Sequence, residues 1–542
     1  MADLSPKEYN VKSIHALIFL IIMTAFLFWV NHDIPFYYDD IRQILKNSSI
    51  QNGIDLTALV NDRLRASRFL MNLSFAVNWL ISGSAPWSFH LFNNLFHAIN
   101  TALLFTLLTR IGGRNTLATG FTCLLFFLHP LQAEGVSYIM GRTELLKTLI
   151  TLALLHLYLR NDRPKWLIYF LLVIAILIKE TCVLIPLMFI VLDFTVLKKT
   201  SKEISKKEHL FYLSHIIWLI PFHLIFQFDK THESVVGFSI FPFWEYLWSN
   251  LYYLFFTVSL FINPTQQAFI HEYVINPPLL ETLLGLILLV AIASTIILQW
   301  RKRPVLAFML SFFLISYLPN NSVLQFINPY AEYRLYQSII VLCWLVGTFL
   351  IDGTKHRIAR LTVGGVLLVF ALTFHVLYLG LWKNPLSLWG HANVAYPQSL
   401  NIAGTLSDEL AKRGLCYEAL RVWDRACLDS TDVCIHFQCL YLNTILETRI
   451  GDVAQAKKHL IEMLQLYQRY PYHAPEVREG IYLSHPASQA FYHNVVALAW
   501  DSKDQGLFQQ VLQEARLKHP GMFANFSLQN LLPMEPCFDK PF

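Results

Sequence analysis

Long apolar segments recur through the first 384 residues and constrain the fold more than any other feature of the chain. Hydrophobic residues make up 55% of the 542 and charged residues 15%, whereas soluble domains contain about 25% charged residues. A helix needs roughly 20 residues to cross a bilayer core. The runs that reach or approach this length are 14–30, 89–109, 115–130, 144–159, 166–179, 181–197, 210–228, 243–262, 279–299, 305–319, 333–351 and 361–380. The sequence therefore predicts an all-α membrane protein.

Basic clusters between these runs predict how the chain crosses the membrane. They lie at residues 110–114, 160–165, 198–207, 301–303 and 355–360. Positively charged loops stay on the cytoplasmic side, and all five fall there only if 243–262 lies on the outer surface or re-enters. We therefore expect about eleven spans, a cytoplasmic amino terminus, a retained first helix and an outer loop over 31–88. The net charge of +5, without a basic arm, does not indicate a nucleic-acid partner.

Residues 385–542 have the composition of a soluble domain with helical repeats. Gly414 and Gly451 each separate two helix-forming segments, and they lie 37 residues apart, close to the 34-residue tetratricopeptide period. Each glycine should end its helix in a left-handed conformation. A third, weaker pair spans 486–518. The sequence thus predicts a tetratricopeptide-like domain on the outer side, with a generic domain of helical hairpins as the alternative.

The cysteines follow the same division of the chain. Three of the eight lie in apolar runs and five in the tail, and no CxxC or Cys/His metal-binding spacing occurs. Cys427 and Cys434 stand near the end of one predicted helix and the start of the next. If the tail lies outside, in an oxidising compartment, we expect these two to form a disulfide.

Two adjacent carboxylates, Asp39 and Asp40, directly follow the first apolar run, after Tyr37 and Tyr38. Neighbouring residues on one backbone point in different directions, so one carboxylate can face a substrate while the other holds a second group. This arrangement suits a general base with a supporting acid. The alternative is a solvated turn that happens to contain two acidic residues.

Further ionisable residues border other apolar runs on the predicted outer face, where ionisable groups at membrane depth are costly and often functional. Each has a structural alternative: a snorkelling interfacial pair, a structural ion pair or a histidine at a helix end. Because all of them share a face with Asp39, we expect them to converge on one outward-facing cavity. They are His90, His129, Glu134, Arg142, Lys179, Glu180, Glu332 and Arg334.

The order of these blocks resembles the transmembrane and tetratricopeptide-repeat O-mannosyltransferases, which belong to the GT-C class of glycosyltransferases. The chain departs from the family at Phe69, where proline is usual, and in having only two or three repeats. A short array offers less surface to a polypeptide acceptor. The matching blocks are Tyr38–Asp40 with Ile44 and Asn47, Arg68–Leu70 with Asn78, Pro86, Phe89–Leu91, Asn94 and His97, His129–Leu146, Lys179–Glu180 and Glu332–Tyr336.

The resemblance implies an inverting transferase that moves a monosaccharide, mannose among the candidates, from a polyprenyl-phosphate donor to a hydroxyl acceptor such as Ser or Thr of a protein. It implies Asp39 as the base and Asp40 as a positioning residue. The candidate partners of the donor phosphate are Arg142, Lys179 and Arg334. Glu134 and Glu332 would hold these cations, with His90, His129 and Glu180 in support.

The resemblance also implies a division of labour. Residues 1–384 would form the catalytic membrane domain, and residues 385–542 would present the acceptor on the periplasmic or lumenal side, with a bacterial inner membrane favoured over the endoplasmic reticulum. A divalent metal is compatible with the carboxylate pair but not required. The alternatives are a GT-C enzyme that glycosylates a lipid or lipopolysaccharide, and a non-enzymatic membrane-anchored repeat scaffold. A transporter is disfavoured because no internally repeated half is visible.

Overall fold

The computed structural model divides the chain into two compact units. Unit 1 comprises residues 1–269 and 273–384, and unit 2 comprises residues 270–272 and 385–542. The residues that the structure describes are 9–60, 68–112, 116–200, 206–218, 242–272, 274, 276–321, 330–353, 356–427, 433–469, 496, 499 and 505–518.

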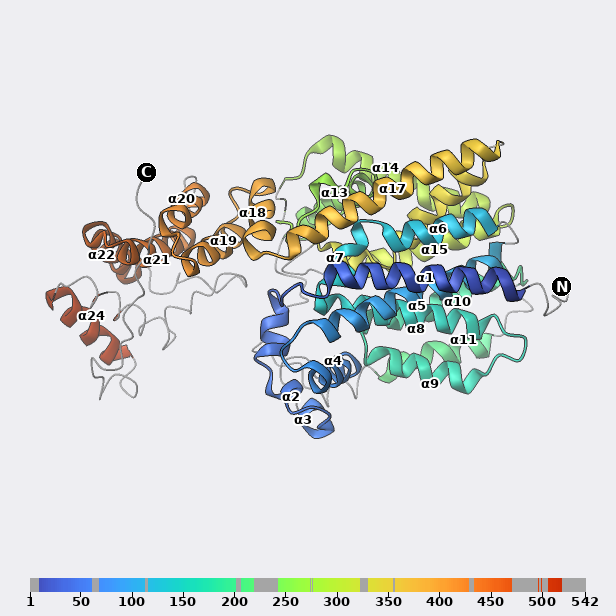
Figure 1. Ribbon diagram of the computed structural model, residues 1–542, viewed down its shortest axis with the longest axis horizontal. Helices are drawn as coiled ribbons and strands as arrows, with labels where there is room; N and C mark the ends of the chain where they lie inside the picture. The colour runs from blue at the N-terminus through green and yellow to red at the C-terminus, as the bar shows by residue number, and fades with distance from the viewer. Residues whose placement is uncertain are drawn as a thin grey trace. The chain divides into compact units, whose positions relative to one another are not determined.

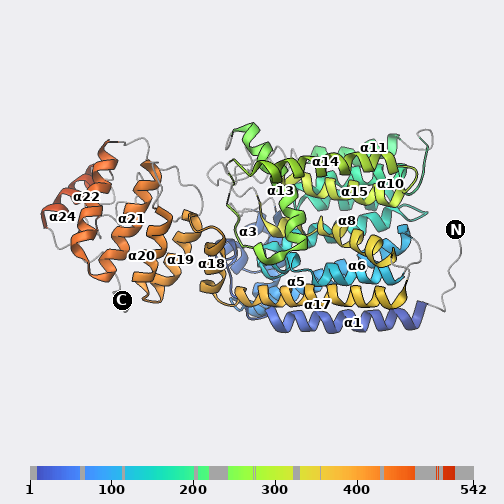
Figure 2. The same ribbon diagram turned by 90° about the horizontal axis from the view of Figure 1, so that it is seen from above.

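Unit 1 is a bundle of helices, and no strand occurs in its described ranges, which confirms the predicted all-α class. Helices α1, α5 and α8 lie side by side, and α6 packs between α5 and α17 (Figures 1 and 2). The long helices are α1 (Tyr9–Asn31), α4 (Phe69–Ser82), α5 (Trp87–Gly112), α6 (Thr116–Leu128), α8 (Arg142–Tyr158), α9 (Lys165–Ile176), α10 (Ile185–Phe194), α13 (Phe243–Ile262), α14 (Leu279–Gln299), α15 (Pro304–Tyr317) and α17 (Arg357–Trp382).

Shorter helical segments of unit 1 connect these helices, and α7, η4 and η8 carry Glu134, Glu180, Glu332 and Arg334. They are the π-helical turns η1 (Ile41–Leu45) and η9 (Val346–Asp352), the short helices α2 (Ser48–Gln51), α3 (Leu56–Val60), α7 (Leu131–Ser137), α11 (Lys206–Leu213) and α16 (Ile339–Leu345), and the 3-10 turns η3 (Ile139–Gly141), η4 (Glu180–Leu184), η5 (Ser214–Trp218), η6 (Pro264–Gln266), η7 (Leu318–Asn320) and η8 (Glu332–Leu335).

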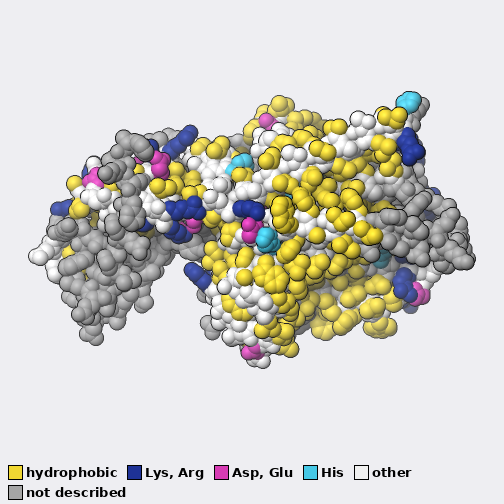
Figure 3. Space-filling model, in the orientation of Figure 1, with side chains coloured by type: hydrophobic (Ala, Val, Ile, Leu, Met, Phe, Trp, Pro, Cys, Tyr) yellow, Lys and Arg dark blue, Asp and Glu magenta, His cyan; other side chains and the backbone are white. Residues whose placement is uncertain are grey.

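The surface of unit 1 is that of a membrane protein. Three described helices, α5, α14 and α17, are long and apolar enough to cross a bilayer, and six shorter apolar helices accompany them. On α14 the side chains of Leu280, Ile287 and Ile297 are more than 60% exposed, which would be unfavourable in water. Figure 3 shows hydrophobic side chains over much of the visible face of the bundle. The count of eleven spans and the placement of 243–262 stay predictions.

A polar stripe inside the bundle explains how the ends of the helices are held. Helix α5 places the buried amides of Asn93 and Asn100 two turns apart. Asn93 Nδ2 donates to the carbonyl of Val136 (3.0 Å), and Asn100 Nδ2 donates to that of Leu145 (3.0 Å). These bonds satisfy backbone groups where α7 ends and α8 begins, so α5 fixes the segment that carries Glu134 and Arg142.

Unit 2 consists of helices that pair in antiparallel fashion, as predicted for helical repeats. Gly414 (φ 79°) and Gly451 (φ 91°) both adopt the left-handed conformation, which confirms the prediction for the ends of the first helices. For the third pair, the second helix is described and the first lies outside the described residues. The helices are α18 (Pro385–Ala395), α19 (Leu400–Lys412), α20 (Cys416–Cys427), α21 (Val433–Ile450), α22 (Val453–Arg469) and α24 (Gln505–Lys518).

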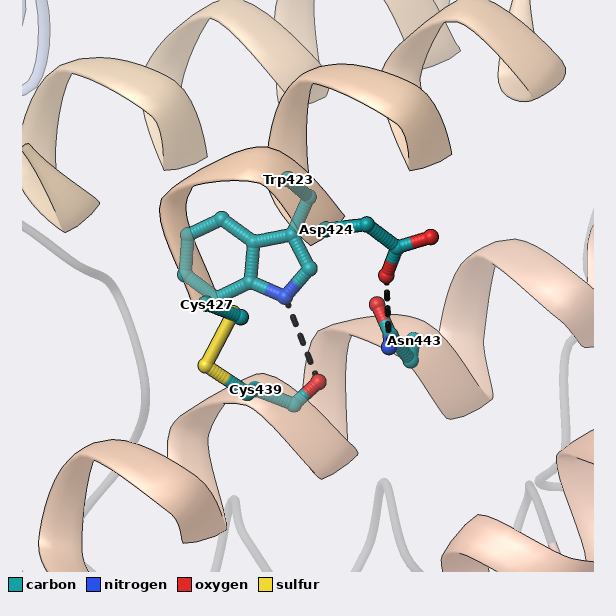
Figure 4. The surroundings of a disulfide bond; sticks show 5 residues. All are labelled: Trp423, Asp424, Cys427, Cys439 and Asn443. Carbon is teal, nitrogen blue, oxygen red and sulfur yellow. Dashed lines mark hydrogen bonds between the residues drawn. A yellow bond between two sulfur atoms is a disulfide. The ribbon is translucent and has the colours of Figure 1, made fainter. Parts of the chain in front are cut away.

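The predicted disulfide between Cys427 and Cys434 is wrong, because Cys427 bonds to Cys439, with 6.0 Å between the Cα atoms. Helix α21 begins at Val433, so Cys439 lies more than one turn inside it, on the side that meets α20. The indole of Trp423 donates to the carbonyl of Cys439 (3.2 Å) and fixes this register (Figure 4).

Candidate functional site

Asp40 is the anchor of the first outer loop. Its side chain is 1% exposed. Its Oδ2 accepts a hydrogen bond from the backbone N–H of Tyr37 (3.1 Å), and its Oδ1 accepts one from that of Met140 (3.0 Å). Tyr38 has a φ of 48°, a left-handed turn that is uncommon for a tyrosine. Asp39 is only half-buried, so the loop is fixed by Asp40 while Asp39 keeps contact with solvent.

The surroundings of Asp40 also affect its proton. Burial raises the pKa of its carboxyl to about 8, against the opposite effect of the N–H donors of Tyr37 and Met140, and the nearby charge of Asp39 acts in the same direction as burial. Near neutral pH, Asp40 therefore holds a proton much of the time. Because both of its oxygens are already engaged by backbone N–H groups, Asp40 is placed to position its neighbours.

Aromatic rings join the first outer loop to distant segments of the chain. Phe269 is the centre, with ring centroids 6.0 Å from Tyr38, 5.2 Å from Tyr138 and 4.9 Å from Trp382. Tyr138 in turn lies 5.7 Å from Tyr333. This aromatic cluster brings the segments that carry Asp39, Glu134 and Glu332 together in unit 1, and the outward-facing cavity stays a prediction.

Arg142, a predicted partner of the donor phosphate, is fully buried and bonded within unit 1. Its Nε donates to Asn93 (2.7 Å), its Nη1 to Asn78 (2.6 Å) and Ser74 (3.0 Å), and its Nη2 to the carbonyl of Phe89 (2.9 Å). Through these four hydrogen bonds, the guanidinium links α8, which carries it, to α4 and α5. This geometry favours a structural role, and we do not retain Arg142 as a phosphate partner.

Glu134 and Glu332, expected to hold cations, lie close enough for their charges to interact, and Arg334 also acts on Glu134. Both are fully buried. Glu332 accepts from the backbone N–H of Ala268 (2.9 Å) and from Gln267 (2.8 Å). Burial, followed by the charge of Glu332, raises the pKa of Glu134 well above its ordinary value, against the opposite effect of the backbone N–H of Tyr333 and the charge of Arg334. Glu332 therefore anchors the connection after α13.

Glu144, a carboxylate for which the sequence predicted no role, pairs with two lysines near the candidate site. Lys179 and Lys147 both form ion pairs with Glu144. The signal was present in the sequence, because Glu144 and Lys147 are ionisable residues one turn apart in an otherwise apolar run. Arg334, half-buried beside the ring of Tyr333, interacts electrostatically with the same Glu144.

The remaining candidates lie at the same end of unit 1 but in structural positions. Glu180 is exposed and pairs with Arg68 (3.4 Å). The Nε2 of His90 is hydrogen-bonded to the carbonyl of Ile34 (2.8 Å), and that of His129 to the carbonyl of Phe261 (3.1 Å). Both histidines are buried and fix backbone segments. In the described part of the chain, no three His, Cys, Asp or Glu side chains are grouped as metal ligands.

Fold and site together define an all-α integral-membrane protein with a soluble-type helical repeat unit, and with carboxylates and cations gathered at one end of its membrane bundle. The comparisons with known proteins agree with this class. Over a third of the chain, 199 residues, it is 30% identical to the protein O-mannosyl-transferase TMTC3 of Mus musculus. Over 212 residues, 34% of the chain, it is 33% identical to the protein O-mannosyl-transferase Tmtc2 of Drosophila melanogaster.

The human protein O-mannosyl-transferase TMTC3 is 31% identical over 190 residues, 32% of the chain. The chain spans about a fifth of the length of these relatives, 20% to 22%. No protein-family model and no solved structure matches it. The resemblance to the transmembrane and tetratricopeptide-repeat O-mannosyltransferases is thereby confirmed.

Proposed function

We propose that this protein is an integral-membrane glycosyltransferase that moves a monosaccharide, mannose in the first place, from a polyprenyl-phosphate donor to a Ser or Thr hydroxyl of a protein. One observation carries the proposal. The bond between Asp40 and Met140 holds Asp39 at the end of the bundle where α8 presents Glu144 with its two lysines. A carboxylate base and a cationic site for a leaving group are thus built from neighbouring segments.

The proposed reaction is a single displacement. The Asp39 carboxylate takes the proton of the acceptor hydroxyl as the hydroxyl oxygen bonds to the anomeric carbon. The bond between that carbon and the phosphate oxygen breaks, and the lipid phosphate leaves with the electron pair. Attack opposite the leaving group inverts the configuration at the anomeric carbon. Lys179 and Arg334 would stabilise the charge that develops on the phosphate.

The disulfide and the basic clusters support our proposal for the side of the membrane. A bond between Cys427 and Cys439 is expected of an oxidising compartment, and the clusters favour a cytoplasmic location for the opposite end of unit 1. We therefore place Asp39 and unit 2 on the lumenal or periplasmic side. The relatives named above come from animals and lend no support to the bacterial membrane favoured from the sequence.

The test is transfer by the purified chain in lipid nanodiscs, with polyprenyl-phosphate mannose as donor and a Ser/Thr-rich unfolded protein as acceptor. Mannose should appear on the acceptor, and a chain that ends at residue 384 should bind the donor but lose this transfer. Transfer to a glycolipid that survives the truncation would favour the lipid-acceptor alternative. If neither acceptor is modified and no donor binds, the proposal is wrong.

A further inference from the structure

A cavity of about 350 Å³ lies in unit 1, at the opposite end of α5 from the candidate site. Its walls come from the end of α5, the start of α6, the start of α15 and the segment α16–η9. Asn93, near the beginning of α5, holds the end of α7, whereas Leu108, which lines the cavity, lies about 22 Å further along the helix axis. The volume falls within the range of about 300 to 1,000 Å³ that is usual for small-molecule sites.

Apolar side chains form most of the cavity wall and extend to the lateral surface of the bundle. Leu108 and Trp344 line the cavity, and so does Phe349, which is 52% exposed. Between α6 and η9 no further space is left, because a Cβ atom at Gly347 would collide with the Thr122 hydroxyl. A ligand can therefore enter from the lateral surface, where the bundle meets lipid, and these walls favour an apolar chain.

A cation borders this apolar cavity, on the turn between α14 and α15. Arg303 lines the cavity, and Arg301 and Lys302 precede it on the same turn. All three are exposed, and none of them has an acidic partner in the part of the chain that the structure describes. The described residues that line the cavity include no Asp or Glu. An anion in the cavity would therefore meet a cation and no competing carboxylate.

The start of α15 adds to this positive character. The helix begins at Pro304, so the N–H groups of Val305 and Leu306 have no partner within the helix. Both residues line the cavity, which places the positive end of the helix dipole at the same wall as Arg303. These features favour a negatively charged group, whereas the other walls favour a hydrocarbon chain. A phospholipid with net negative charge carries both.

We infer that this cavity binds one anionic phospholipid, with its phosphate beside Arg303 and the start of α15 and part of one acyl chain along Leu108 and Phe349. Clusters of basic residues next to membrane helices attract anionic lipids, and here the cluster borders a cavity that a chain can enter. A soluble phosphate would meet the same cation but would leave the apolar walls uncovered. The inference concerns the end of unit 1 away from Asp39, and it does not depend on the proposed sugar transfer.

The test measures lipid binding to the purified full chain in detergent. The protein is titrated with dioleoyl phosphatidylglycerol and, separately, with dioleoyl phosphatidylcholine, which has the same chains and no net charge, and bound lipid is counted by native mass spectrometry. We expect phosphatidylglycerol to bind at least about fivefold more tightly, because Arg303 repels the choline ammonium of the neutral lipid. Arg303→Gln should lose most of this preference. Lys302→Gln, which removes the same charge from the same turn outside the cavity lining, is the matched control and should keep it.

A second variant tests the place of the acyl chain. Thr119, half-buried on α6, lines the cavity, and Thr119→Phe fills the space without changing the charge. Binding of both lipids should be lost or strongly weakened, and glycerol phosphate, which has no chains, should not displace phosphatidylglycerol from the wild type. Should Thr119→Phe fail to fold, Arg303→Gln and Lys302→Gln decide the question, because both change exposed side chains.

Several results would overturn the inference. Equal affinities of the wild type for the two lipids would show that Arg303 does not select an anionic lipid. Equal losses in Arg303→Gln and Lys302→Gln would show that the basic turn attracts anions at the surface and not at the cavity. Unchanged binding in a folded Thr119→Phe would place the chain elsewhere, and displacement by glycerol phosphate would show that the site takes a soluble phosphate.

Discussion

Asp40 accepts a hydrogen bond from the backbone N–H of Met140 across 100 residues of sequence, at 3.0 Å. This bond docks the first outer loop onto the turn that precedes α8. The same carboxyl accepts a hydrogen bond from the backbone N–H of Tyr37 within its own loop. The bond to Tyr37 holds the shape of the loop, and the bond to Met140 attaches the loop to the rest of unit 1. Asp40 thus fixes the loop, and we propose that the half-buried Asp39, which precedes it, carries the chemistry.

The change of the melting temperature with pH should show that Asp40 holds a proton in the folded protein. Burial raises the pKa of this carboxyl from 3.8 to about 8, so the folded protein keeps a proton that the unfolded chain releases. The stabilisation is complete below the unfolded pKa and is lost as the pH rises through about 8. The melting temperature of the wild type should therefore fall between about pH 5 and pH 8.5, and it should fall less in Asp40→Asn.

Asp33→Asn provides the comparison for this experiment. Burial acts to raise the pKa of Asp33, but the ion pair with Lys383 outweighs it and lowers that pKa. Asp33 therefore titrates below the range of the measurement, and its variant should show the same fall as the wild type. Equal slopes for Asp40→Asn and the wild type would show that Asp40 does not carry this proton.

Arg142→Lys should be strongly destabilising. The guanidinium donates to four acceptors on α4 and α5, and an ammonium cannot reproduce this planar set of donors. Breaking a buried charged network costs about 3 kcal/mol or more, visible as a lower melting temperature in detergent. Arg160→Lys, at an exposed ion pair, should melt as the wild type does. A stable but inactive Arg142→Lys would restore Arg142 as a binder of the donor phosphate.

Because the two cysteines share one bond, the losses of stability caused by removing each of them should not add. Removing a bond that closes a loop of about a dozen residues should destabilise unit 2 by about 3 kcal/mol. Because Cys427 and Cys439 form one bond, Cys427→Ala, Cys439→Ala and the double variant should have nearly the same melting temperature. Peptide mapping without reductant should recover the two cysteines in one linked fragment. A double variant that loses the sum of the two single effects would contradict this pairing.

Membrane orientation can be tested with single cysteines introduced at two exposed positions of unit 1. Lys302 lies between α14 and α15, and Asn52 lies in the first outer loop. A membrane-impermeant thiol reagent added to sealed vesicles with the lumenal side outward should label Asn52→Cys and leave Lys302→Cys unmodified. The opposite pattern would move Asp39 to the cytoplasm and exclude a lumenal reaction.

Much of the candidate site could be predicted because its residues follow apolar runs whose ends the basic clusters place on one face. The turns at Gly414 and Gly451 were predictable for a local reason, the left-handed conformation that ends a helix. Two features were not. The burial of Arg142 depends on Asn78 and Asn93, whose orientation is fixed only when α4 and α5 pack.

The disulfide partner depends on where α21 begins, since a shift of the first residue changes which cysteine faces α20. The pairing of Lys179 with Glu144 likewise joins α8 to the segment that precedes η4, and neither segment alone predicts it. In each case the missing information was the packing between elements that are distant in sequence. Local patterns predicted which residues would gather at one end of unit 1, but not which of them would touch.

The most direct test of the account compares Asp39→Asn with Asp40→Asn in sugar transfer from polyprenyl-phosphate mannose. Both substitutions preserve volume, and Asp162→Asn, an exposed carboxylate paired with Arg160, controls for the loss of a charge. Donor binding and melting temperature are measured for each, so that turnover is compared between folded proteins. If Asp39 is the general base, Asp39→Asn should lose about 100- to 10,000-fold in turnover with donor binding intact, and Asp40→Asn should lose less. Near wild-type turnover in Asp39→Asn would contradict the account.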